Sequence, residues 1–321
     1  MRVFVCAFIG SVAAASSHAA PLIAAAPSPD ITLPEDWVRQ AAVILPLIPV
    51  SDRAAAQRNY ANMLIDVHRC DEAAILFQND TKLDAAVTST SMTHAIALRD
   101  MPCASRLAHV ALGKIPASTD LTARGVQALR MRAGAAIVVG ENPSTGFATI
   151  ADAEQRLRDS PAADESGNEG TLWETRLTLL GIFAGGEFYR STMEAYAKEL
   201  ATTVRRPPVQ YWTPTTKGYV LQFAKSGRPD LVQMITAPLF PSQRREAATV
   251  QEMGEHWRYQ ASHKVRGCPI LGAKTTDRSP ASSAPMDILI NLALRSQNVA
   301  LTERCEAIAP SEIATVRSAG D

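Results

Sequence analysis

The chain has 321 residues, of which 46% are hydrophobic and 20% are charged, so it can bury a large core as one extended domain or as two. Its 32 basic and 32 acidic residues cancel, and this balance excludes a long-range attraction to nucleic acid or to anionic lipid. We therefore predict no nucleic-acid partner.

Residues 1–19 have the three parts of a secretory signal peptide. Arg2 supplies a positive charge, residues 3–15 are apolar and uncharged, and Ser17-His18-Ala19 forms a small-x-small cleavage site. We predict cleavage after Ala19, with alternative sites among residues 24–26. An uncleaved membrane anchor is the competing interpretation, but the apolar stretch is too short for it.

The rest of the chain is predicted to have no integral membrane segment, because no later stretch approaches the roughly 18 to 20 apolar residues of a membrane span. Residues 20–31 carry three prolines among alanines and are predicted to be a poorly ordered leader. Arg outnumbers Lys 25 to 7 and Ala is abundant, as in proteins from GC-rich bacteria. We therefore predict a protein of the bacterial envelope, periplasmic or secreted.

Four cysteines remain after the signal peptide, and an even number in an exported chain indicates disulfides. Three pairings are possible. The positions favour Cys70 with Cys103 and Cys268 with Cys305, because each pair lies within one local run of predicted helices. A zinc site made by all four is the alternative, but no C-x2-C pair occurs. We predict two local disulfides and no metal site.

Helical patterns begin at Thr32-Leu33-Pro34-Glu35, which has the spacing of a capping box, and the first helix is predicted to end at Pro46. A second helix opens near Ser51 and repeats apolar residues at intervals of three and four. Further helices are predicted over residues 72–77, 83–98 and 104–112.

The segments Arg69–Ala73 and Pro102–Arg106 begin comparable helices 33 residues apart, near the period of helix-turn-helix solenoid repeats. In architecture this resembles the tetratricopeptide-like class, over about residues 51–240. The consensus Trp, Gly, Tyr and Ala positions of that class are mostly missing, and a plain irregular helical bundle explains the same pattern. The predicted fold class is all-α, an irregular array of antiparallel helical hairpins.

Three segments look like breaks between helices, at residues 160–170, 205–214 and 272–285. The first is predicted to separate an N-terminal helical half, residues 32–160, from a C-terminal half, residues 171–309. The second half is predicted to start with a capping box, Thr171-Leu172-Trp173-Glu174, and to contain an amphipathic helix over residues 187–204.

The most unusual candidate surface is the segment 205–212. Arg205, Arg206, Tyr211 and Trp212 flank a stiff Pro-Pro step, and Arg and aromatic residues are the usual anchors of binding sites. Further along the chain, Trp257 and Arg258 repeat this chemistry, and the two segments are predicted to face one groove. The alternative is that Tyr211 and Trp212 plug the core below the loop.

No catalytic, metal-binding or nucleotide-binding motif stands out, so we predict no cofactor. Histidines are the first residues to consider as a base or a metal ligand, and none of them belongs to an H-E-x-x-H or H-x-H pattern. After the predicted signal peptide, which contains His18, they are His68, His94, His109, His256 and His263. Glu252 and His256 are four apart on a predicted helix, and we expect only a surface contact between them.

These patterns predict a non-catalytic scaffold that binds a protein, a peptide or a cell-envelope polymer in a groove containing residues 205–212. The alternative is an envelope enzyme, such as a peptidoglycan-cleaving hydrolase, with Glu174 or Glu252 as its acid. An enzyme should have a closed cleft with a buried acid of shifted pKa, whereas a binding protein should have an open groove.

Overall fold

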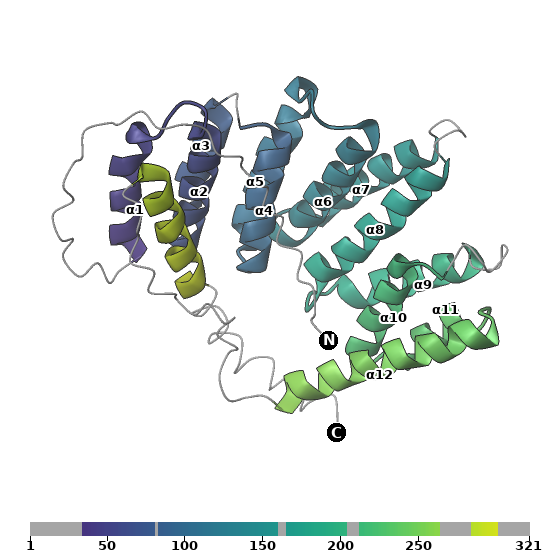
Figure 1. Ribbon diagram of the computed structural model, residues 1–321. Helices are drawn as coiled ribbons and strands as arrows, with labels where there is room; N and C mark the ends of the chain where they lie inside the picture. Colours follow the sequence, from purple (N-terminus) through teal and green to yellow (C-terminus); the bar gives the residue numbers. More distant parts are fainter. Residues whose placement is uncertain (1–33, 81–82, 160–164, 204–211, 264–283, 301–321) are drawn as a thin grey trace. The chain divides into compact units, whose positions relative to one another are not determined.

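The computed structural model describes residues 34–80, 83–159, 165–203, 212–263 and 284–300. Within these ranges every regular element is a helix, so the all-α prediction is confirmed there. In chain order the helices are α1 (Pro34–Ile44), α2 (Arg53–Asp66), α3 (Cys70–Asn79), α4 (Ala85–Ala97), α5 (Met101–Lys114), α6 (Ala123–Gly140), α7 (Pro143–Arg158), α8 (Glu165–Phe183), α9 (Tyr189–Thr203), α10 (Pro214–Lys225), α11 (Pro229–Thr236) and α12 (Pro241–His263) (Figure 1).

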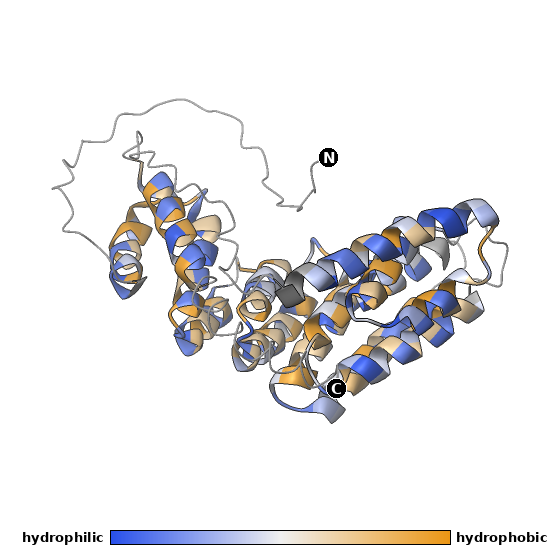
Figure 2. Ribbon diagram, turned by 90° about the horizontal axis from the view of Figure 1, so that it is seen from below, coloured by the Kyte–Doolittle hydropathy of each residue, from blue (hydrophilic) through white to orange (hydrophobic). Residues whose placement is uncertain are grey.

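A further helix covers residues 285–300 and buries Leu289, Leu292 and Ser296 at spacings of three and four. Most helices carry hydrophobic and hydrophilic residues side by side, as Figure 2 shows, and their apolar stripes supply the core. Among the described helices, none combines the length and the apolar character needed to cross a membrane. The predicted signal peptide and leader lie outside the described residues.

Three turns between helices share one backbone geometry. The helices α2, α4 and α10 are each followed by a residue in the left-handed region, namely His68, Arg99 and Gly227, at φ of 60°, 59° and 67°. After α2, the amides of His68 and Arg69 donate to the carbonyls of Ile65 and Leu64, which is a Schellman cap, and the other two turns repeat this pattern. The next helix starts within two residues and returns to contact the one before it. Three helical hairpins are thereby closed by the same device.

A disulfide joins Cys70, in the first turn of α3, to Cys103, in the first turn of α5, with their Cα atoms 5.6 Å apart. The first of the two predicted pairings is therefore confirmed. Cys268 and Cys305 lie outside the described residues, and their pairing stays a prediction.

Side-chain bonds between hairpins join residues about one hairpin apart in sequence. Arg69 Nη1 bonds Glu35 Oε2 at 3.2 Å, and Arg228 Nη1 bonds Glu194 Oε1 at 2.9 Å, and both pairs are 34 residues apart. The disulfide spans 33 residues. These three links each join two hairpins that follow one another in the sequence.

The helices α6, α7 and α8 share one hydrophobic cluster, so elements on both sides of residues 160–164 pack on the same core. Two facing glycines allow α6 and α7 to approach closely, because a Cβ on Gly134 or on Gly146 would run into the carbonyl oxygen of the other. The division into two helical halves at this segment stays a prediction.

The start of α8 differs from the sequence prediction. The helix begins at Glu165, so Thr171-Leu172-Trp173-Glu174 is not a capping box but lies inside the helix. There the Thr171 hydroxyl donates to the carbonyl of Gly167 at 2.9 Å. A threonine hydroxyl can bond the carbonyl four residues back as well as cap a helix start, and this is why the pattern misled the prediction.

A buried ion cluster joins α7, α8 and α9. Arg176 is 3% exposed, and its Nε and Nη2 each donate to the Glu154 carboxylate at 2.7 Å. Its Nη1 lies 3.0 Å from Glu199 Oε2, and the rings of Trp173 and Tyr196 lie 4.9 and 4.7 Å from its Cζ. Because the guanidinium is paired and stacked inside the protein, this cluster fixes the packing of the three helices.

Candidate functional site

The predicted surface around Trp212 is described only in part, because Arg205, Arg206 and Tyr211 lie outside the described residues. Trp212 packs partly against the core cluster of α8 to α12, and its Nε1 donates to Glu246 of α12. Its ring lies 5.5 Å from Lys217 Nζ. Part of the indole is therefore used for internal packing.

The second predicted segment lies on α12, where Trp257 and Arg258 are exposed. Lys225 of α10 places its Nζ 3.8 Å from the centre of the Trp257 ring. Glu246, which holds Trp212, precedes Trp257 by three turns of α12, or about 16 Å. Trp212 and Trp257 thus contact the same two helices, α10 and α12, but at positions about three helical turns apart. A groove shared by the two indoles stays a prediction.

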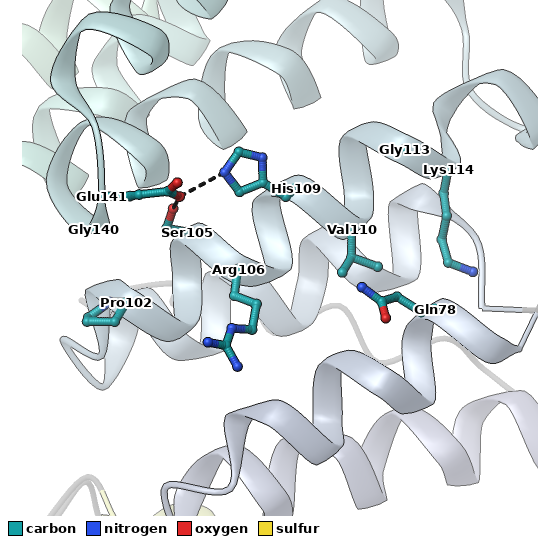
Figure 3. A pocket seen from close by; sticks show the side chains of 10 residues that line it. All are labelled: Gln78, Pro102, Ser105, Arg106, His109, Val110, Gly113, Lys114, Gly140 and Glu141. Carbon is teal, nitrogen blue, oxygen red and sulfur yellow. Dashed lines mark hydrogen bonds and ion pairs between the residues drawn. The ribbon is translucent and has the colours of Figure 1, made fainter.

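A cavity of about 670 Å³ lies along α5, where no binding site was predicted (Figure 3). It is lined by Gln78 of α3, by Pro102, Ser105, Arg106, His109, Val110, Gly113 and Lys114 of α5, and by Gly140 and Glu141 at the end of α6. The α5 residues recur every three or four positions, so they form one side of that helix. Pro102 and Lys114 are about 18 Å apart along the axis, which makes the cavity elongated.

Glu141 is held on one side of this cavity by two hydrogen bonds. Its Oε2 accepts from Ser105 Oγ and from His109 Nε2, both at 2.8 Å (Figure 3). The bond from His109, and then the one from Ser105, hold the pKa of Glu141 below its ordinary value. Glu141 is exposed, and both bonds use the same oxygen. The ionised carboxylate therefore has a fixed direction, and neither Ser105 nor His109 bonds its Oε1.

Gly140 explains how Glu141 reaches α5. A Cβ at this position would run into the carbonyl of Met101 and the side chain of Ser105, so a larger residue would push the end of α6 away. The last carbonyls of α6 are the negative end of the helix dipole. They add negative potential to the corner where Glu141 lies.

The opposite side of the cavity is basic and is tied to α3. Arg106 forms an ion pair with Asp71, next to the disulfide. Lys114 Nζ donates to the carbonyl of Asp80 at 2.8 Å, and burial lowers the pKa of this amine. Figure 3 shows Arg106 and Gln78 on the side of α5 away from Glu141. The cavity therefore has an acidic wall, with Glu141, and a second wall with the cations Arg106 and Lys114. Arg106 has Asp71 as its acidic neighbour, and Lys114 has Asp80 and Asp84. We call this second side the basic wall, after its two lining cations.

No family model matches this chain, and no curated protein or solved structure matches it. Its function has to be argued from the residues of the site.

A second cavity of about 620 Å³ lies between the end of α5 and the helices α6 and α7. Its polar lining comes from Arg130, Ser144, Thr145, Thr149 and Asp152. Arg130 Nη1 lies 3.3 Å from Asp152 Oδ2, so its main charges are already paired with each other. This cavity therefore offers mainly hydroxyl groups to a ligand.

The acids considered for catalysis are both on the surface, since Glu174 on α8 and Glu252 on α12 are exposed. Of the histidines, His94 is buried, with its Nε2 2.7 Å from Asp66 Oδ1, and His256 is exposed on α12. Among the described residues, no group of three or more His, Cys, Asp or Glu could hold a metal ion.

Sequence reasoning considered His109 but not its partner Glu141. Ser105 and His109 are four residues apart and share a helix side, which was a usable signal. Glu141 follows Gly140 at a helix end, and nothing in its local pattern relates it to α5.

Proposed function

We propose that this protein is an exported, non-catalytic scaffold that binds a segment of a polypeptide partner in the cavity along α5. The observation that carries the proposal is the elongated, two-walled cavity, with ionised Glu141 on one side and Arg106 and Lys114 on the other. Polar groups held in place before a ligand arrives lower the ordering cost of binding.

Export is supported by the disulfide and by the N-terminal pattern. Disulfides persist in oxidising compartments and are rare in the cytosol, where thiols are kept reduced. Residues 1–19 have the arrangement of a signal peptide. N-terminal sequencing of the protein recovered from the periplasm or the medium should give a mature chain that starts near residue 20. A chain that starts at Met1 and stays in the cytosol would contradict export.

Binding is favoured over hydrolysis by the protonation state of the acids. A general acid needs a raised pKa, as burial in an apolar pocket provides. In the described part of the chain, the carboxyl groups with a shifted pKa have it lowered by their partners, namely Glu72, Glu141, Asp152, Glu194, Asp230 and Glu246. Such groups stay ionised and suit ion pairing rather than proton donation.

We also propose that the hairpins are successive units of a tetratricopeptide-like array. The three equal Schellman turns and the bonds that span 33 or 34 residues support this arrangement. Native-state hydrogen exchange should then show neighbouring helix pairs opening as separate units. A single global opening for all helices would favour the irregular bundle.

Photocrosslinking tests the binding site directly. A photoreactive phenylalanine analogue placed at Gln78, which is exposed on the cavity wall, should form adducts with a protein of the envelope fraction. The same analogue at Glu174, exposed on α8, is the matched control and should form none of these adducts. Identical adducts at both positions, or none at Gln78, would contradict the proposed site.

The exposed Trp257 of α12 is a second contact surface in this proposal, because tryptophan is enriched among the residues that carry most of the binding energy of interfaces. Trp257→Ala should weaken partner capture while the circular dichroism spectrum stays unchanged. Unchanged capture would remove the α10–α12 surface from the proposal.

A further inference from the structure

We infer that the segment bound along α5 carries charges of both signs, with a basic group placed against Glu141 and an acidic group against Arg106 and Lys114. This inference rests on the proposed function, because it specifies the chemistry of the polypeptide that the same cavity takes. It predicts a sequence preference in the ligand that can be measured apart from binding itself.

The acidic wall is built to receive a cation. Glu141 keeps one carboxylate oxygen without a bond from Ser105 or His109, since both donate to Oε2. The end of α6 directs its last carbonyls to the same corner. A lysine or arginine side chain, with several N–H donors, satisfies a carboxylate and nearby carbonyls together.

The basic wall has N–H donors left for an anion besides those that bond Asp71 and the carbonyl of Asp80. The Arg106 guanidinium contacts Asp71 through Nη1, and its fork of five N–H groups has further donors for a second carboxylate. Lys114 gives one of its three protons to the carbonyl of Asp80. The exposed amide of Gln78 lies between them on the wall contributed by α3 (Figure 3).

The dimensions suit an extended chain. The cavity runs about 18 Å along α5. An extended strand rises about 3.3 Å per residue, so the cavity holds roughly five residues. Val110 and Pro102 offer apolar contacts along the same side of the helix.

A polymer of one charge sign fits this surface less well. A polyanion would place negative charges against Glu141, and a polycation would place positive charges against Arg106 and Lys114. Like charges brought together at an interface cost free energy, so both polymers would bind less well. A segment with a basic and an acidic residue a few positions apart avoids both repulsions.

Selection of random hexapeptides on phage tests the inference. The baits are the oxidised mature protein, Glu141→Gln and Arg106→Gln, with Glu174→Gln and Arg190→Gln as controls that make the same charge changes on α8 and α9. The wild-type protein and both controls should select peptides that contain both a basic and an acidic residue. The Glu141→Gln bait should select peptides that keep the acidic residue but no longer prefer a basic one. The Arg106→Gln bait should select peptides that keep the basic residue but no longer prefer an acidic one.

A synthetic peptide from the wild-type selection then gives the size of the effect. Its affinity, measured by fluorescence anisotropy, should fall about fivefold for Glu141→Gln, as is typical of one solvent-accessible ion pair. Replacing the basic residue of the peptide by glutamate should weaken binding to the wild type more than this, because two carboxylates then face each other. The same peptide should bind the Glu141→Lys variant more tightly than it binds the wild type. Circular dichroism establishes that each variant is folded.

The outcomes separate the inference from the proposed function. If the wild type selects peptides without a charge preference, or if both cavity variants select the same peptides as the wild type, the inference is wrong and peptide binding stands. If the wild type selects no peptide, both are wrong.

Discussion

Arg176 and Glu141 are each held by two charged or hydrogen-bonding partners, but solvent reaches them very differently. Arg176 lies between α7, α8 and α9 at 3% exposure, and its bidentate partner Glu154 is buried with it, while Glu199 reaches it from the partly exposed side. Glu141 stands at the end of α6 on the wall of a cavity, and its partners both hold one oxygen. A paired charged side chain thus contributes to packing at Arg176, whereas at Glu141 it stays accessible to a ligand.

This difference shows how a structural ion cluster can be told from a binding group in this protein. A buried charge has to find its partners within the fold, because desolvation without them costs several kcal/mol. An exposed charge gains little stability from its partners and stays in contact with solvent, where a ligand can reach it. The following measurements contrast the two regions.

The largest effect is expected for Arg176→Ala. This change removes the two hydrogen bonds that the buried Glu154 carboxylate accepts and leaves it with Arg158, whose Nη2 lies 3.5 Å away, as its one remaining cation. We expect the free energy of unfolding to fall by about 3 kcal/mol. Urea denaturation measures it. Arg190→Ala, which removes an exposed pair with Glu194, is the control and should have almost no effect. A similar loss of unfolding free energy in both variants would contradict a special role of the buried Arg176 cluster in stability.

The disulfide strengthens the region of the α5 cavity. Replacing Cys70 and Cys103 by serine releases a loop of 33 residues, which should lower stability by about 3–4 kcal/mol in the chain-entropy model. Hydrogen exchange should rise first in α3 and α5, while the helices around Arg176 stay protected. Faster exchange around Arg176 at the same denaturant concentration would mean that the two regions unfold together.

Two glycines of the same cavity are expected to respond differently. Gly140→Ala forces a Cβ against the backbone of Met101, and we expect a loss of about 1–3 kcal/mol. Gly113→Ala has open space around the new methyl group and should be neutral or stabilising by up to about 0.5 kcal/mol. Thermal melts of the two variants make the comparison. A stable Gly140→Ala protein would show that α6 need not lie against α5.

The smallest effect is expected for Glu141→Gln, and it depends on pH. His109 and Ser105 lower the pKa of Glu141 from its ordinary 4.5, so the folded state favours the ionised form. The stabilisation is therefore present above about pH 4.5 and is lost as the pH falls through the lowered pKa. Urea unfolding at pH 7 and at pH 3 should show a small deficit of the variant at pH 7 that shrinks at pH 3. A deficit that grows in acid would contradict this assignment.

The helices were predictable because burial imposes a spacing of three and four on apolar residues. The helix predicted over residues 187–204 is α9, and Met193, Tyr196 and Leu200, at spacings of three and four, are buried in it. The Cys70–Cys103 pair was predictable because each cysteine precedes or begins a helix of the same local run. Each of these features depends on residues that lie within one continuous stretch of the sequence.

The α5 cavity was not predictable in the same way. Ser105, His109 and Glu141 come from two helices, and the contact depends on the missing side chain of Gly140. A pattern read along one helix does not say which other helix ends beside it. For the same reason the packing of Trp212 against Glu246, 34 residues further on, was not evident.

The short reach of the bonds between hairpins bears on how the chain acquires its shape during synthesis. A polypeptide emerges with its amino terminus first, and a bond to a residue 34 positions earlier can form as soon as one more hairpin has emerged. The sulfur atoms at positions 70 and 103 can meet long before the carboxyl terminus exists. Stepwise assembly in the direction of synthesis is thus compatible with these contacts, and low contact order of this kind favours rapid folding.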